Sequence, residues 1–170
     1  MPRRTLMALV LGAWMAGTLF MWGVATQNFR LVDRILAAPP EPWSERARFL
    51  PPQDVRLLMR HQASEVNRLF FERWGWAQIG LGILFAGLVF SAPSDRWLRL
   101  SAVAMLGIAL GLQFGVVPET VRLGRLLDFA PRDPAPPEWA PFWRLHAAYT
   151  GLDGTRLLLN LFAAFRLARS

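Results

Sequence analysis

The chain has 170 residues, is 54% hydrophobic and carries a formal net charge of +7, from 19 basic residues that are all arginine against 12 acidic residues. Its length allows one domain, residues 1–170. Cysteine is absent, which excludes disulfides, thiol catalysis and thiolate metal sites. The arginines are spread along the sequence and form no single basic face, so nucleic acid is not an expected partner.

The first predicted element is a membrane-spanning helix near the N-terminus. Residues 5–29 contain no charged side chain. A helix of this length can cross a hydrocarbon core of about 30 Å. The apolar run is longer than the roughly 7–15 residues of a signal-peptide core. We therefore expect a retained helix over about residues 5–27.

The next segment mixes proline-rich sequence with an amphipathic pattern. The prolines between residues 30 and 52 predict an ordered loop or a short hairpin-like excursion. From about residue 53 to 73 the spacing of apolar and charged residues has the helical period. This amphipathic helix should lie on the membrane surface or lead without a break into the following span.

Two more charge-free segments follow, residues 74–94 and 100–118. They predict spans at about 74–92 and 99–118, joined by a turn so short that the two helices must be antiparallel neighbours. The third helix is expected to continue past residue 119 and to end before a proline-rich connection. Tryptophans at the ends of the predicted spans are typical of the headgroup level.

Glycine repeats every fourth residue in the third predicted span, at Gly107, Gly111 and Gly115. This spacing forms a groove that lets another helix approach closely. Small residues at Gly12 with Ala16, and at Gly82 with Ala86, could fill the groove within one chain. A self-association face is the alternative.

A fourth span is predicted at about residues 142–165, although Arg144, Asp153 and Arg156 interrupt it. Asp153 and Arg156 are three residues apart, so each can neutralise the other on one side of a helix. The expected fold is therefore all-α, an integral membrane bundle of four transmembrane helices plus an amphipathic surface helix.

Polar residues recur along this fourth helix and form what we call the polar stripe. At about 100° per residue, positions seven apart drift by only about 20°. The stripe comprises His146, Thr150, Asp153, Arg156 and Asn160. Polar groups are costly in lipid and should face the interior, where Gln113, Gln78 and Thr18 could meet them. The stripe is either an ion- or proton-binding cavity or a fully hydrogen-bonded network that fixes the helices.

Other kinds of site find little support in the sequence. His61 and His146 are the only histidines and are predicted at different depths, which disfavours a bis-histidine haem. The methionines are scattered, and neither a hydrolytic triad nor a phosphate loop is evident. We therefore predict no enzymatic activity, cofactor or metal; bound haem or pigment would instead give a visible absorption band.

The order of these features resembles a known family. Gln113, Pro118, Arg122 and Arg125 at the end of the third span, and Phe142 four residues before His146, are similar to the bacterial domain-of-unknown-function family of four-helix membrane proteins related to eukaryotic transmembrane protein two-hundred-five. The family pattern has serine and asparagine where this chain has Tyr149 and Asp153. The resemblance implies four spans with both termini on one side, and no established activity.

Arginine near the span ends predicts the orientation. On the side of the termini, six arginines oppose Asp95 alone, which places both termini in the cytoplasm of a bacterial inner membrane. We expect a non-enzymatic structural or accessory subunit of a larger membrane complex, with the lipid bilayer and a membrane protein as partners. The alternative is a transporter-like or small-ligand- or ion-binding protein that uses the polar stripe.

Overall fold

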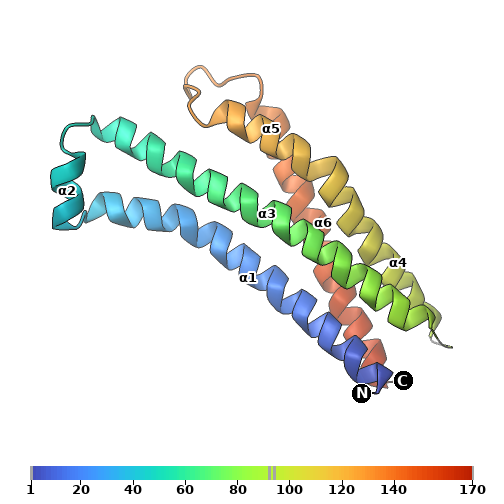
Figure 1. Ribbon diagram of the computed structural model, residues 1–170. Helices are drawn as coiled ribbons and strands as arrows, with labels where there is room; N and C mark the ends of the chain where they lie inside the picture. The colour runs from blue at the N-terminus through green and yellow to red at the C-terminus, as the bar shows by residue number, and fades with distance from the viewer. Residues whose placement is uncertain (1, 92, 94, 170) are drawn as a thin grey trace.

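The computed structural model describes residues 2–91, 93 and 95–169, and every regular element within them is helical (Figure 1). The elements, in chain order, are α1 (Arg3–Ala37), α2 (Glu41–Ala47), α3 (Pro52–Phe90), α4 (Arg96–Gly111), the π-helical turn η1 (Leu112–Val116), α5 (Val117–Leu127) and α6 (Trp139–Arg169).

Four rods, α1, α3, the α4–η1–α5 helix and α6, pack side by side. Helix α1 contacts α3 and α6, and α4 also contacts both α3 and α6, so the rods surround one core. The prediction that the second and third spans are neighbours is therefore confirmed by the contact between α3 and α4. Both termini lie at one end, and at the other end α1, α2 and the start of α3 diverge from α5 and α6 (Figure 1). We call this diverging part the arm.

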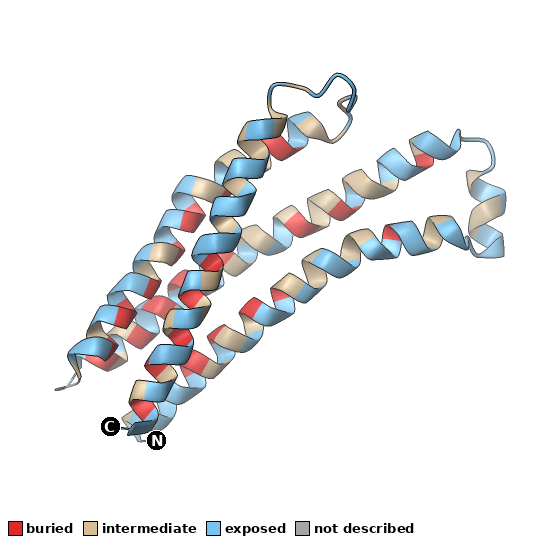
Figure 2. Ribbon diagram, turned by 180° about the vertical axis from the view of Figure 1, so that it is seen from behind, coloured by how far each residue is buried: buried red, intermediate tan, exposed pale blue. Residues whose placement is uncertain are grey.

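The apolar core lies toward the end that holds the termini. Trp14 of α1, Val89 of α3, Met105 of α4 and Ala163 of α6 are completely shielded, at 0% exposure. Buried residues line the inner faces of the helices, whereas the outward faces are mostly exposed (Figure 2). Those outward faces carry many large apolar side chains, as a membrane protein's lipid-facing surface does.

Within the described residues, three helices are long and apolar enough to cross a membrane: α1, α3 and the continuous helix Arg96–Leu127. This confirms a helical membrane protein in outline, but the predicted fourth span at 142–165 is not among the three. It lies within α6, which has 31 residues and therefore ample length. The polar residues Asp153, Arg156 and Asn160 keep its hydropathy low.

The prediction of a separate surface helix over residues 53–73 is wrong. Residues 53–73 form the first half of α3, which runs unbroken for 39 residues, the second of the two arrangements that the sequence left open. No proline follows Pro52 within this stretch, so nothing interrupts its hydrogen bonding. The predicted end of the second span at residue 92 lies outside the described residues.

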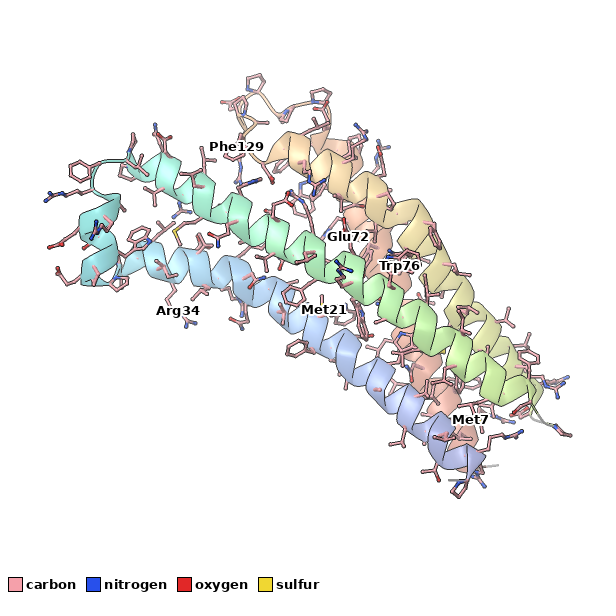
Figure 3. All side chains as sticks on the ribbon, viewed as in Figure 1. Met7, Met21, Arg34, Glu72, Trp76 and Phe129 are labelled. Carbon is pink, nitrogen blue, oxygen red and sulfur yellow. The ribbon has the colours of Figure 1, made fainter. Side chains whose placement is uncertain are left out.

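The proline-rich segment after α1 also contains more helix than predicted. Helix α1 continues to Ala37, ten residues past the predicted end of the first span, and α2 occupies part of the expected loop. Pro42 lies in the first turn of α2, where a missing N–H costs nothing. Met7 and Arg34 mark the two ends of α1, one near the termini and one on the arm (Figure 3).

A π-helical turn lets the third rod continue through a proline. Pro118 is the second residue of α5, in the first turn after η1. Proline removes one hydrogen bond and clashes with the carbonyl four residues earlier, and a widened π turn relieves that strain. The same turn buries Gln113. The predicted helical continuation beyond residue 119 is present as α5, which ends at Leu127.

Candidate functional site

The interior of the protein holds a charged pair between α1 and α6. Asp153 and Arg156 are each 1% exposed, and Arg156 Nη2 lies 2.6 Å from Asp153 Oδ1. Trp22 Nε1 donates a hydrogen bond to Asp153 Oδ2 at 2.7 Å, and Arg156 Nη2 donates to Thr18 Oγ1 at 3.0 Å. Each charge is therefore opposed by its partner and held by a polar group of α1, the combination that a buried ion pair requires.

One face of α1 supplies three side chains that contact this pair, Trp14, Thr18 and Trp22. The Arg156 guanidinium carbon lies 5.4 Å from the centre of the Trp14 ring, within cation–π range. Thr18 Oγ1 also donates to the Trp14 carbonyl. Trp14, Thr18 and Trp22 are four residues apart, so they share one helical face. The four-residue spacing could have indicated that Trp14 and Trp22 face the interior together with Thr18. The two tryptophans were not predicted as part of the site.

The network around the pair is not fully hydrogen-bonded. Several buried atoms near the pair have no hydrogen-bond partner among the described residues: Trp14 Nε1, Gln78 Nε2, Arg156 Nη1, Asn160 Oδ1 and Asp153 Oδ1, the last of which has only its ion-pair contact with Arg156. Buried polar atoms without partners cost stability. The structural interpretation of the polar stripe assumed a network in which every polar group is hydrogen-bonded. The observed network is buried as that interpretation expects, but its hydrogen bonding is incomplete.

The structure divides the predicted polar stripe into two parts. Asp153, Arg156 and Asn160 are buried in the core, whereas His146 and Thr150 are exposed. The prediction of one buried stripe is wrong for these last two. His146 lies at nearly the same angle around α6 as Asp153, but it is exposed and lines a pocket between α1, α3, α5 and α6. Gln113 is buried elsewhere, facing Gly75 of α3.

The predicted glycine groove faces away from the chain's other helices. A side chain added at Gly107, Gly111 or Gly115 would meet no atom within 4 Å, and all three residues are exposed. The expectation that the groove is filled within the chain is therefore wrong, because α3 and α6 pack against other faces of α4. Close packing occurs instead at Gly17 against Trp74 and at Gly82 against Leu106.

A second charged cluster, the arginine brace, joins α3 to the end of α5. Arg68 donates through Nη1 and Nη2 to the two oxygens of Asp128, at 2.7 Å each. Arg68 also contacts Glu65, and Arg125 donates two hydrogen bonds to Glu65 at 3.1 Å. His61 Nδ1 lies 2.7 Å from Asp128 Oδ2. Sixty residues separate Arg68 from Asp128, so no local pattern could have indicated the pairing.

The brace also contains a possible set of metal ligands. One ligand atom each of His61, Glu65 and Asp128 lies within 4.8 Å of the others. However, Arg68 and Arg125 already neutralise the two carboxylates, and a cation would have to displace the paired guanidinium of Arg68. The residues therefore fit an ion-pair brace better than a metal site.

A pocket of about 150 Å³ opens beside the brace, between α1, α3, α5 and α6. We call it the arm pocket. His146 lines it, but Asp153 does not. The ring of His146 stacks on Phe142 with an interplanar angle of 15°. The lining residues are Phe29, Ser64, Asn67, Arg68, Phe71, Val117, Thr120, Val121, Phe142, His146 and Tyr149.

Comparison with known proteins does not add a relative. No protein-family model, curated protein or solved structure matches the chain. The resemblance to the four-helix membrane family therefore stays a prediction, and the function has to be argued from the geometry above.

Proposed function

We propose that the protein is a small non-enzymatic subunit of a larger membrane complex. In this proposal α1, the charge-free half of α3 from Trp74, the α4–η1 segment and α6 all cross a bacterial inner membrane, with both termini in the cytoplasm. The outward-facing glycines of α4 and η1 then bind a helix of the partner.

The glycine face is the observation that carries the proposal. Glycine weakens a helix by about 1 kcal/mol relative to alanine, and lipid chains require no close backbone approach. Three glycines at four-residue spacing on an exposed surface are therefore better explained by a second helix, for which small residues permit close packing.

The buried ion pair supports a structural role over a transport role. Asp153 and Arg156 are each 1% exposed and are held by Thr18 and Trp22. A transport pathway needs such groups to be reachable from one side of the membrane. Here they fix α6 against α1, which suits a rigid subunit. Such rigidity leaves the outer faces to interact with other proteins.

The test is purification of the tagged chain from native membranes in a mild detergent, followed by mass spectrometry of the co-purifying proteins. We expect a stoichiometric partner with the natural chain and its loss from Gly111→Leu, whose added side chain would hold the partner helix away. Gly80→Leu on α3 is the matched control, because Gly80 is also an exposed helical glycine with no atom within 4 Å.

Two results would contradict the proposal. One is a natural chain that purifies without any stoichiometric partner. The other is a partner that stays bound to the Gly111→Leu variant as it does to Gly80→Leu, because the glycine face would then take no part in the contact.

A further inference from the structure

The arm pocket lies at the level where the charge-free segments of the helices end. Three lining residues lie at the ends of the charge-free segments. Phe29 ends the segment 5–29 of α1, and Phe71 lies three residues before the segment 74–94 begins in α3. Val117 lies one residue before the end of the segment 100–118. In a membrane, this level is the boundary between hydrocarbon and headgroups. A molecule dissolved in the bilayer could therefore place its polar end in the pocket.

The walls of the pocket suit a flat ring. Aromatic side chains from three helices line it: Phe29 of α1, Phe71 of α3, and Phe142, His146 and Tyr149 of α6. Phe71 and Tyr149 meet edge to face, with ring centres 5.3 Å apart. An apolar cavity of about 150 Å³ is known to hold a single six-membered ring such as benzene. The size and the aromatic lining thus indicate one substituted ring.

Two polar groups in the pocket lack a partner in the chain. The hydroxyl of Ser64 on α3 and the ring nitrogens of His146 on α6 make no hydrogen bond within the part of the chain that the structure describes. Asn67 is already committed, since its amide donates to the Ala25 carbonyl and accepts from Asn28. Ser64 and His146 can each donate to an acceptor oxygen of a ligand, one from either side.

The ion pairs at the edge of the pocket disfavour an acidic ligand. Arg68 is the only ionised side chain among the lining residues, and both of its terminal nitrogens are bound by the carboxylates of Asp128 and Glu65. A phosphate or carboxylate would have to compete with these pairs. An uncharged ring whose oxygens accept hydrogen bonds needs no such exchange.

From these observations we infer that the arm pocket binds a lipid-soluble, uncharged ring compound with carbonyl oxygens, the chemical class of the isoprenoid quinones. The ring lies among the aromatic side chains, Ser64 and His146 donate to its oxygens, and its apolar tail extends into the bilayer. This inference is independent of the glycine face and of any partner protein.

The experiment measures binding of 2,3-dimethoxy-5-methyl-6-decyl-1,4-benzoquinone to the full chain in lipid nanodiscs, through quenching of tryptophan fluorescence. We expect saturable quenching above that of the same nanodiscs with Val121→Phe, which fills the pocket. Ser64→Ala and His146→Phe should each weaken binding by about 2- to 10-fold, the effect of one hydrogen bond. Thr155→Val, on the same helix but outside the pocket, should bind as the natural chain does.

The controls separate a ring site from a site for lipid tails. Decanol carries a similar tail without the ring, and it should not compete. Competition by decanol at equal concentration would overturn the inference in favour of an acyl-chain pocket. Quenching that does not saturate, or that Val121→Phe leaves unchanged, would also overturn it. Thermal unfolding of each variant checks that it is folded.

Discussion

The indole nitrogen of Trp22 donates a hydrogen bond to Asp153 Oδ2 at 2.7 Å, joining two residues that are 131 positions apart in the chain. The bond ties the first long helix to the last. In the proposed arrangement, in which α6 crosses the membrane, α6 without α1 would present Asp153 and Arg156 to lipid, which is costly. The low hydropathy of α6 is therefore compensated by a specific partner, and we expect α6 to be stable in the membrane only beside α1.

Replacing Trp22 by phenylalanine should lower the stability of the folded protein. Phenylalanine keeps an aromatic ring but removes the N–H donor, leaving one oxygen of a buried carboxylate without its hydrogen bond. The expected loss is about 1.5–3 kcal/mol, the contribution of a hydrogen bond to a charged group. It is measured as a shift of the unfolding midpoint in detergent. Trp76→Phe is the control, because Trp76 of α3 is 56% exposed (Figure 3), and it should change the midpoint little. If the two variants shift the midpoint equally, the hydrogen bond from Trp22 to Asp153 does not contribute the expected stability.

Removing only one member of the buried ion pair should cost more than removing both. Asp153→Ala leaves the Arg156 guanidinium buried without its counter-charge, for an expected loss of about 3–5 kcal/mol. Combining Asp153→Leu with Arg156→Met removes both charges and fills similar volume, so much of that stability should return. Denaturant or thermal unfolding of the three proteins measures the difference. A double variant less stable than Asp153→Ala would show that the pair itself is net stabilising.

Features set by local spacing could be predicted from the sequence. The three charge-free helices, the short connection between α3 and α4 and the continuation of the third helix as α5 all depend on hydropathy and on helix-breaking residues. Burial of Asp153, Arg156 and Asn160 also follows from local spacing, because polar groups on one face of an apolar helix have only the interior to turn to.

What the sequence could not provide is the relation between distant segments. His146 faces a pocket that α1, α3, α5 and α6 form together, and not the core. The π turn before Pro118 and the packing of Gly17 against Trp74 depend on which helices meet. For the same reason Gly107, Gly111 and Gly115 faced outward against expectation, since spacing within one helix does not say which face its neighbours cover.

The tightly packed glycines should respond to substitution differently from the open ones. A methyl group at Gly17 would overlap the ring of Trp74, whereas at Gly23, on the same helix, it would meet no atom within 4 Å. Gly17→Ala should therefore destabilise the protein by about 1–3 kcal/mol through overpacking. Gly23→Ala should be neutral or slightly stabilising, since alanine favours helix. Thermal unfolding in one detergent compares them, and a Gly17→Ala variant as stable as Gly23→Ala would argue against close packing of α1 on α3.

The arginine brace predicts a dependence of stability on acidic pH. Hydrogen bonding from Arg125, together with Arg68 and against a smaller opposing effect of burial, lowers the pKa of Glu65 from about 4.5 to about 2. A carboxyl whose folded-state pKa is depressed adds stability above its unfolded pKa, and this stability is lost as pH falls toward the folded value. The protein should therefore lose stability between about pH 4.5 and pH 2, and Glu65→Gln should lose less over that window.

Unfolding midpoints at pH 6 and at pH 2.5 test this expectation. Glu45→Gln is the matched control, because it removes an exposed carboxylate of α2 that forms no ion pair with the described residues. The difference in midpoint between the two pH values should be smaller for Glu65→Gln than for the natural chain, and unchanged for Glu45→Gln. If Glu65→Gln keeps the full difference, the acid sensitivity arises at other carboxylates and the contact of Glu65 with Arg125 contributes little to the joint between α3 and α5.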